Sequence, residues 1–134
     1  MQIAARNGSI PLLQLLHSHG GSLYTRGLRG DTLFHLAGYN GHIDTMRWLQ
    51  KRGILPEAVD LMGQTVIHVA ARRGELAVLK YLYEELNMDG FSQEDFDGRT
   101  PLDCIPRRGP PEIEQCRDYL TMIYTLESSS STDG

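Results

Sequence analysis

The stretch GDTLFHLAGYNGHIDTMRWL, from Gly30 to Leu49, recurs 33 residues later as GQTVIHVAARRGELAVLKYL, from Gly63 to Leu82. A fixed period of this size is typical of solenoids, in which each structural unit packs only against its neighbours along the chain. The repeat therefore predicts a stack of similar units, an architecture that offers an extended surface more readily than an enclosed reaction site.

Shorter matches show that the repeat continues on both sides of these two copies. IAARNG, at residues 3–8, matches VAARRG, at residues 69–74, and GRTPLD, at residues 98–103, opens a further copy that is displaced by 35 residues. Two residues are thus added in the third connector, around residues 86–91. We expect one repeat domain over residues 1–126, with a truncated first unit (1–29), a second (30–62), a third (63–97) and a degraded last unit (98–126).

Composition places the chain among small intracellular domains. Its 134 residues amount to one domain, and 40% apolar content suffices for a modest core. The chain has neither an apolar run long enough to span a membrane nor a signal-like start, and its only cysteines, Cys104 and Cys116, lie in apolar stretches. We therefore expect reduced thiols and a location in the cytoplasm, the nucleus or both. Residues 127–134, ESSSSTDG, are predicted to be a disordered tail.

Within each unit, local signals predict a pair of antiparallel helices. A threonine precedes a short apolar run in three units and can cap a helix N-terminus: Thr32, Thr65 and Thr100. Gly41 and Gly74 stand where the first helix must end, after about nine residues. Apolar residues spaced by three, as at Leu76, Leu79 and Leu82, then line one face of a second helix.

Two prolines distinguish the terminal units. Pro11 falls in the first turn of the second helix of unit one, where its missing N–H has no cost. Pro106 falls inside the first helix of unit four, where it removes a hydrogen bond and should fray that helix. The last second helix can still form from Pro111 to about Leu126, with one apolar face made by Ile113, Cys116, Leu120 and Ile123.

The Gly-x-Thr opening, the histidine three residues after the threonine, the small Ala-Ala step and the Gly before the second helix together resemble the ankyrin repeat. This resemblance covers roughly residues 1–126 and implies an all-α solenoid of antiparallel helix pairs, with β-hairpin fingers at residues 20–31, 53–64 and 88–99. It also implies that His35 and His68 are structural and bond to Thr32, Thr65 and nearby backbone.

No catalytic motif is found in the sequence. It has no GxSxG, HExxH or phosphate-binding loop, and the pair His17 and His19 has no third metal ligand nearby in sequence. We therefore predict that the chain is not an enzyme and has no catalytic residue, cofactor, metal or small-molecule ligand.

In ankyrin repeats, partners are recognised through the finger tips and the inner faces of the first helices, the positions that the consensus leaves variable. In this sequence the candidate partner-binding residues at such positions are Arg26, Leu28, Arg29, Tyr39, Asn40, Leu61, Met62, Arg72, Arg73, Phe96, Arg99, Arg107 and Arg108. The wider set of twenty variable positions adds Arg6, Asn7, Asp31, Val59, Gln64, Glu94 and Asp97.

This wider set holds eight of the eleven arginines and only three acidic residues, although the whole chain has a net charge of −4. A basic concave face on an acidic body follows. Arginine suits bidentate contact with carboxylates and phosphates, but a solvated helix face would also carry it. Likewise, apolar residues at the finger tips could anchor a partner or pack between adjacent fingers.

The leading hypothesis is a scaffold or adaptor module that binds an acidic or phosphorylated protein segment, with no membrane insertion. One alternative is a fragment or short isoform of a longer ankyrin array in a signalling or adaptor protein, which would leave Ile3, Leu12 and Leu15 uncovered. A nucleic-acid-associated regulator is the weaker alternative, because the net charge is negative and the aromatic residues are few.

Overall fold

The computed structural model describes residues 1–132, with side chains to residue 127, and within them it contains helices and turns but no β-strand. The helices, in chain order, are α1 (Gln2–Arg6), α2 (Ile10–Ser18), α3 (Leu33–Tyr39), α4 (Ile43–Lys51), α5 (Val66–Arg73), α6 (Leu76–Lys80), the π-helical turn η1 (Tyr81–Glu85), α7 (Pro101–Cys104) and α8 (Pro111–Thr132).

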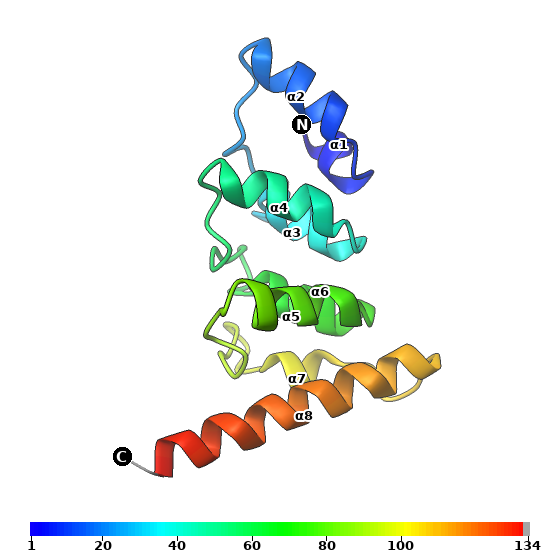
Figure 1. Ribbon diagram of the computed structural model, residues 1–134, viewed down its shortest axis with the longest axis vertical. Coiled ribbons are helices and arrows are strands. Elements are labelled where there is room, and N and C mark those ends of the chain that lie inside the picture. Colours follow the sequence, from blue (N-terminus) through cyan, green and yellow to red (C-terminus); the bar gives the residue numbers. More distant parts are fainter. Residues whose placement is uncertain (133–134) are drawn as a thin grey trace.

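Four helix pairs are stacked along the long axis of the molecule (Figure 1), with the first unit at one end and α8 at the other. The first helices α1, α3, α5 and α7 contact one another in that order, and each packs against the second helix of its own unit. The core lies between these two rows and includes Leu33, Met46, Ile67 and Leu79. The all-α repeat fold is confirmed.

A threonine and a histidine fix the start of each central first helix. The Thr32 hydroxyl accepts from the His35 N–H, and the Thr32 N–H donates to Nδ1 of the His35 ring at 3.2 Å. Because Nδ1 accepts, the imidazole proton sits on Nε2, which donates to the Gln64 carbonyl at 2.9 Å. His68 does the same with Thr65 and the Arg99 carbonyl. The expected structural role of both histidines is confirmed, and each ties its helix to the next finger.

The β-hairpin fingers are not confirmed. Each finger ends in a tight turn; in the second, Asp60 N–H donates to the Gln64 carbonyl and Gly63 N–H to the Asp60 carbonyl. Adjacent fingers share a single backbone bond, such as Leu61 N–H to the Arg29 carbonyl at 2.9 Å. These few bonds are enough to close each turn and to link adjacent fingers. They are too few to form the ladder of backbone bonds that defines a β-strand pair.

The third connector differs from the others because it carries the two added residues. It follows η1, the end of the second helix, where the Leu86 N–H reaches back five residues to the Tyr81 carbonyl, and it turns at Asn87, whose φ is 51°. Phe91 then returns to the core, fully buried, with its ring edge-to-face against Tyr83 at 5.3 Å. The insertion was visible in the sequence, but this anchor was not.

The last unit is asymmetric. Its first helix, α7, has only four residues and ends at Cys104, two residues before Pro106. Its second helix, α8, has 22 residues and buries Cys116 and Leu120 on the expected face. α8 continues to Thr132, into the segment for which the sequence predicts a disordered tail. Residues 133 and 134 of the predicted tail lie outside the described residues.

Candidate partner-binding groove

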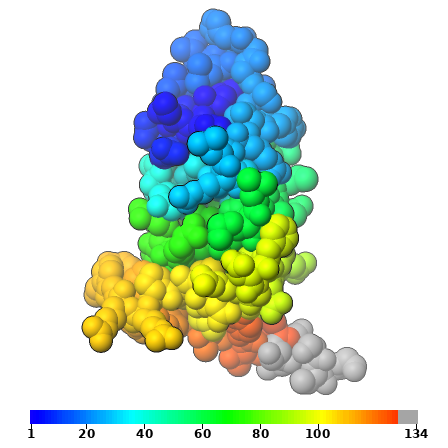
Figure 2. Space-filling view, turned by 180° about the vertical axis from the view of Figure 1, so that it is seen from behind, coloured from blue at the N-terminus to red at the C-terminus, as the bar shows by residue number. Residues whose placement is uncertain are grey.

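A groove of about 520 Å³ runs along the concave face between the fingers and the first helices. Figure 2 views the molecule from this side, with the fingers along one edge and the segment around residue 110 projecting at the other. The groove is lined by Gln2, Arg6, Gly27, Leu28, Arg29, Asp31, His35, Leu36, Tyr39, Asn40, Asp60, Met62, Gln64, Val69 and Arg72.

Six of the thirteen candidate residues line this groove: Leu28, Arg29, Tyr39, Asn40, Met62 and Arg72. Seven lie outside it: Arg26, Leu61, Arg73, Phe96, Arg99, Arg107 and Arg108. Of the wider set, Arg6, Asp31 and Gln64 also contribute to the lining. The groove therefore joins units one to three and does not include the candidate arginines of unit four.

Arg26 is engaged within the fold. Its Nη1 donates to the Gly30 carbonyl at 3.1 Å, in its own finger, and to the Val59 carbonyl at 2.8 Å, in the next connector. This guanidinium holds two successive fingers together, so its first role is structural.

Asn40 and Arg73 occupy equivalent positions in units two and three and make equivalent contacts. Asn40 Nδ2 donates to the Arg6 carbonyl at 3.0 Å, and Arg73 Nε donates to the Tyr39 carbonyl at 3.3 Å. The Arg73 guanidinium also lies 4.3 Å from the centre of the Tyr39 ring. Each side chain thus links the end of its first helix to the unit before it, a repeated contact that sequence spacing did not reveal.

Arg72 is held in the groove by a chain of side-chain hydrogen bonds. Asp95 Oδ1 accepts from the N–H groups of Asp97 and Arg99, both at 2.9 Å, and Asp95 Oδ2 accepts from Gln64 Nε2 at 3.0 Å. Since its amide nitrogen faces a carboxylate, Gln64 presents Oε1 to Arg72 Nη1, at 2.9 Å. The bond from Gln64, with those backbone donors, lowers the pKa of Asp95.

Asp60 repeats the finger-closing role of Asp95. Its Oδ1 accepts from the Met62 N–H at 2.8 Å and from the Gln64 N–H at 3.0 Å. The finger-closing role of these two aspartates was not predicted from the sequence, although each stands three residues before the glycine of its finger, where the first finger has Gly27. An Asp that bonds the backbone two residues ahead is a common turn device and was a usable signal.

The three finger tips place apolar residues at equivalent positions. Leu28, Leu61 and Phe96 are 102%, 70% and 74% exposed. Leu61 also lies over Gly30, and Phe96 lies over Gly63, where a β-carbon would come within 2.6 Å of the ring. Packing between fingers therefore covers part of the Leu61 and Phe96 side chains, whereas the Leu28 side chain is wholly exposed.

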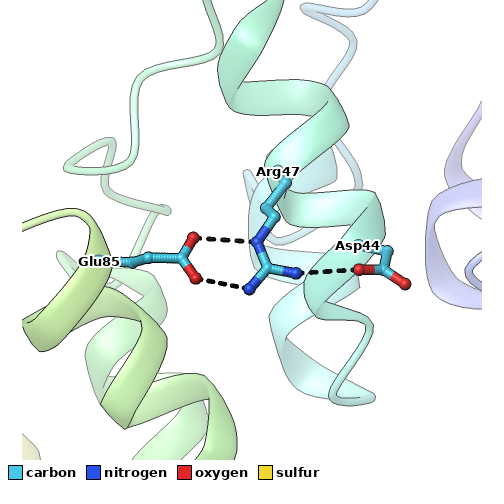
Figure 3. A network of polar contacts seen from close by, with 3 residues as sticks. All are labelled: Asp44, Arg47 and Glu85. Carbon is cyan, nitrogen blue, oxygen red and sulfur yellow. Dashed lines mark hydrogen bonds and ion pairs between the residues drawn. The ribbon is translucent and has the colours of Figure 1, made fainter.

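The second helices carry a different polar contact (Figure 3). Arg47 on α4 donates to both carboxylate oxygens of Glu85 on η1, at 2.9 and 2.5 Å, and to Asp44 Oδ1 at 3.0 Å. Hydrogen bonding to Glu85 raises the pKa of Arg47, and the same contact lowers that of Glu85. Arg47 and Glu85, which join units two and three, are about half exposed, so water and salt weaken the pair.

Across the part of the chain that the structure describes, no cluster of three His, Cys, Asp or Glu side chains has the arrangement of a metal site. In the same part of the chain, every helix is too short or too polar to cross a membrane.

A sequence model of ankyrin repeats matches residues 1–93 in three copies. No curated protein matches the chain. The matched region contains the whole groove, whereas α7 and α8 lie beyond it.

Proposed function

This chain belongs to the ankyrin repeat family, and because such repeats generally mediate protein–protein interaction, we propose that its groove binds an acidic or phosphorylated protein segment. The repeats are typically non-enzymatic modules. Two free thiols, Cys104 and Cys116, whose pKa values are raised by burial, suit the intracellular setting that we assign to this module.

The observation that carries the proposal is the fixed position of Arg72. One N–H of its guanidinium donates to Gln64 Oε1, and this bond orients the half-buried guanidinium at the groove wall. The remaining N–H groups of an arginine can bind a carboxylate or phosphate bidentately, and a preoriented fork loses less entropy on binding. Arg6 and Arg29 line the same groove and add positive charge.

The groove lining holds three arginines and two acids, Asp31 and Asp60, so positive charge is in excess by one. Asp60 is buried, and its Oδ1 already accepts two backbone N–H groups of its own finger. Tyr39 and Met62, which are 37% and 46% exposed, line the groove as well and offer apolar contact. The surface therefore suits an extended segment in which acidic and apolar residues alternate.

A binding titration tests the proposal with defined peptides. A fluorescein-labelled peptide of alternating Glu and Leu, its phosphoserine counterpart and a Gln-for-Glu control are titrated at low ionic strength, with fluorescence anisotropy as the readout. Arg72→Gln should weaken binding of both anionic peptides by about tenfold or more, the size expected for a lost charge-assisted bond. Lys51→Gln, an exposed substitution outside the groove, removes the same charge and serves as the matched control.

Gln64→Leu separates orientation from charge, because it frees the Arg72 fork and leaves the net charge unchanged. We expect an intermediate loss of affinity, with circular dichroism showing intact helices. Equal weakening by Lys51→Gln, equal binding of the uncharged peptide, or tighter binding of a DNA oligonucleotide would each refute the proposed segment.

A further inference from the structure

One row of side chains crosses the groove from unit to unit. Arg6, Tyr39 and Arg72 recur with the 33-residue period, at the same position of units one, two and three, and all of them line the groove. Each lies at or next to the last residue of its first helix. We refer to these residues as the groove row. It presents a positive charge, an aromatic ring and a second positive charge, in that order.

Two hydrogen bonds between units hold the groove row in register. The Arg6 carbonyl accepts from Asn40 Nδ2 at 3.0 Å, and the Tyr39 carbonyl accepts from Arg73 Nε at 3.3 Å. The helices that carry the row, α1, α3 and α5, contact one another in that order (Figure 1). Because packed helices have axes about 8–10 Å apart, the two arginines of the row are separated by about 16–20 Å.

The charges around the groove row favour an anion at each end of it. Both acids of the groove lining, Asp31 and Asp60, belong to the fingers, so the row itself contains no carboxylate. Arg6 is exposed, and Arg72 is half-buried and oriented by its bond to Gln64. Each guanidinium can therefore receive a carboxylate or a phosphate from the partner.

Tyr39 supplies an apolar contact at the middle of the row. Its side chain is 37% exposed, and the Arg73 guanidinium lies over its ring, 4.3 Å from the ring centre. Unit four does not extend the row, because its equivalent residue, Arg107, follows the shortened α7 and lies outside the groove lining. The groove row therefore suits a partner that offers an anion, an apolar residue and an anion at matching intervals.

The spacing of the row selects among the conformations of a bound segment. In a polyproline II helix every third residue faces the same side and one turn rises about 9.3 Å, which matches the step of about 8–10 Å between packed helices. In a β-strand, residues on one side recur every 6–7 Å or so, which is too short for that step. Seven residues of an α-helix rise about 10.5 Å, so two such steps reach about 21 Å and overshoot the row.

We propose that the segment bound in the groove is a polyproline II helix of the form acid-x-x-apolar-x-x-acid. Its two acidic or phosphorylated residues lie on Arg6 and Arg72, and its apolar residue lies on Tyr39. This inference rests on the proposed function and adds which residues of the partner are recognised. The alternating Glu and Leu peptide contains the same pattern, because its residues three apart differ in kind and its residues six apart are alike.

Two peptides of one composition test the register by fluorescence anisotropy at low ionic strength. Glu-Pro-Ser-Leu-Pro-Ser-Glu has the proposed spacing, whereas its isomer Pro-Glu-Ser-Leu-Ser-Glu-Pro separates the acids by four residues; both have uncharged ends and a fluorescein label. The first should bind about tenfold more tightly or better, because in the isomer only one acid at a time can reach an arginine of the row.

Two matched variants assign this preference to the row. Arg6→Gln should lower the affinity for the first peptide to that for the isomer. Arg29→Gln removes the same charge from a finger that lines the same groove outside the row, so it should weaken both peptides alike and leave their ratio unchanged. Circular dichroism checks that both variants keep their helices.

The outcomes separate this register from the proposed function. If the alternating peptide binds but the two isomers bind equally, the register is wrong and the proposed function stands. The same conclusion follows if Arg29→Gln, and not Arg6→Gln, abolishes the preference, or if a helix-forming peptide with the three residues seven apart binds more tightly. If none of the anionic peptides binds, both proposals fail.

Discussion

Each of the two histidines, His35 and His68, links its own helix to the threonine that caps that helix and to the next finger. Nδ1 accepts from the threonine that caps its own helix, and Nε2 donates to a carbonyl of the next finger, as in the 2.9 Å bond from His35 to Gln64. A neutral imidazole is required for this arrangement, because a protonated ring would turn the Nδ1 acceptor into a donor facing another N–H.

The neutral form of His35 and His68 makes stability depend on pH. Burial lowers the pKa of both below the 6.5 of an unperturbed imidazole. Between the lowered pKa and 6.5 the unfolded chain binds more protons than the folded chain, so the free energy of unfolding should fall as the pH drops below about 6.5. Urea melts between pH 5 and 8 measure this fall.

The pKa values of Glu85 and Asp95 are also lowered. The stability that these carboxylates contribute is therefore lost only at more acid pH, below their ordinary pKa values of 4.5 and 3.8.

NMR titration of the histidine ring protons provides the control. His35 and His68 should titrate at lower pH in the native protein than in urea, and equal values in the two states would contradict the prediction.

At the scale of elements, the fingers are held by stacking as much as by their own turns. Gly63 and Gly98 end successive fingers with the same φ of 77°, but only Gly63 lies beneath an aromatic ring. A β-carbon on Gly63 would come within 2.6 Å of Phe96, whereas one on Gly98 would meet nothing within 4 Å.

This pair of glycines separates backbone strain from packing. Gly98→Ala should cost about 1–2 kcal/mol, the price of a left-handed conformation for alanine. Gly63→Ala should cost about 1–3 kcal/mol more, because Phe96 must also move. Chemical denaturation of both variants measures the difference, and equal costs would show that the finger tips do not stack in solution.

The fingers also mark where prediction from sequence succeeded and where it stopped. Their positions followed from the resemblance to ankyrin repeats, in which a finger connects each pair of helices to the next. Their lack of strands did not follow, because it depends on how many backbone bonds the stacked turns can form. Likewise, the sequence showed that the third connector has two extra residues. It did not show that Phe91 is buried against Tyr83, because that burial depends on tertiary contacts.

At the scale of the whole molecule, stability should vary along the stack. Units two and three are covered on both sides, whereas α1 and α2 are covered on one side and α1 has only five residues. In a solenoid each unit is stabilised by its own packing and by its neighbours, so the central helices should open least often.

Hydrogen exchange measures this gradient. Amides of α5 should be the most protected, and those of α1 and α2 should exchange sooner. Uniform protection across all units would contradict the gradient and indicate that the stack unfolds only as a whole.

The sequence by itself determined the all-α repeat fold, the capping role of the threonines and the early end of α7 near Pro106. It could do so because those features depend on residues a few positions apart, and the period repeats them. Tertiary structure decided which arginines are available: Arg26 and Arg73 are bound to the backbone of other units, whereas Arg72 is oriented by Gln64. These bonds link residues that are distant along the chain or depend on a neighbouring unit, so they exist only once the units are stacked.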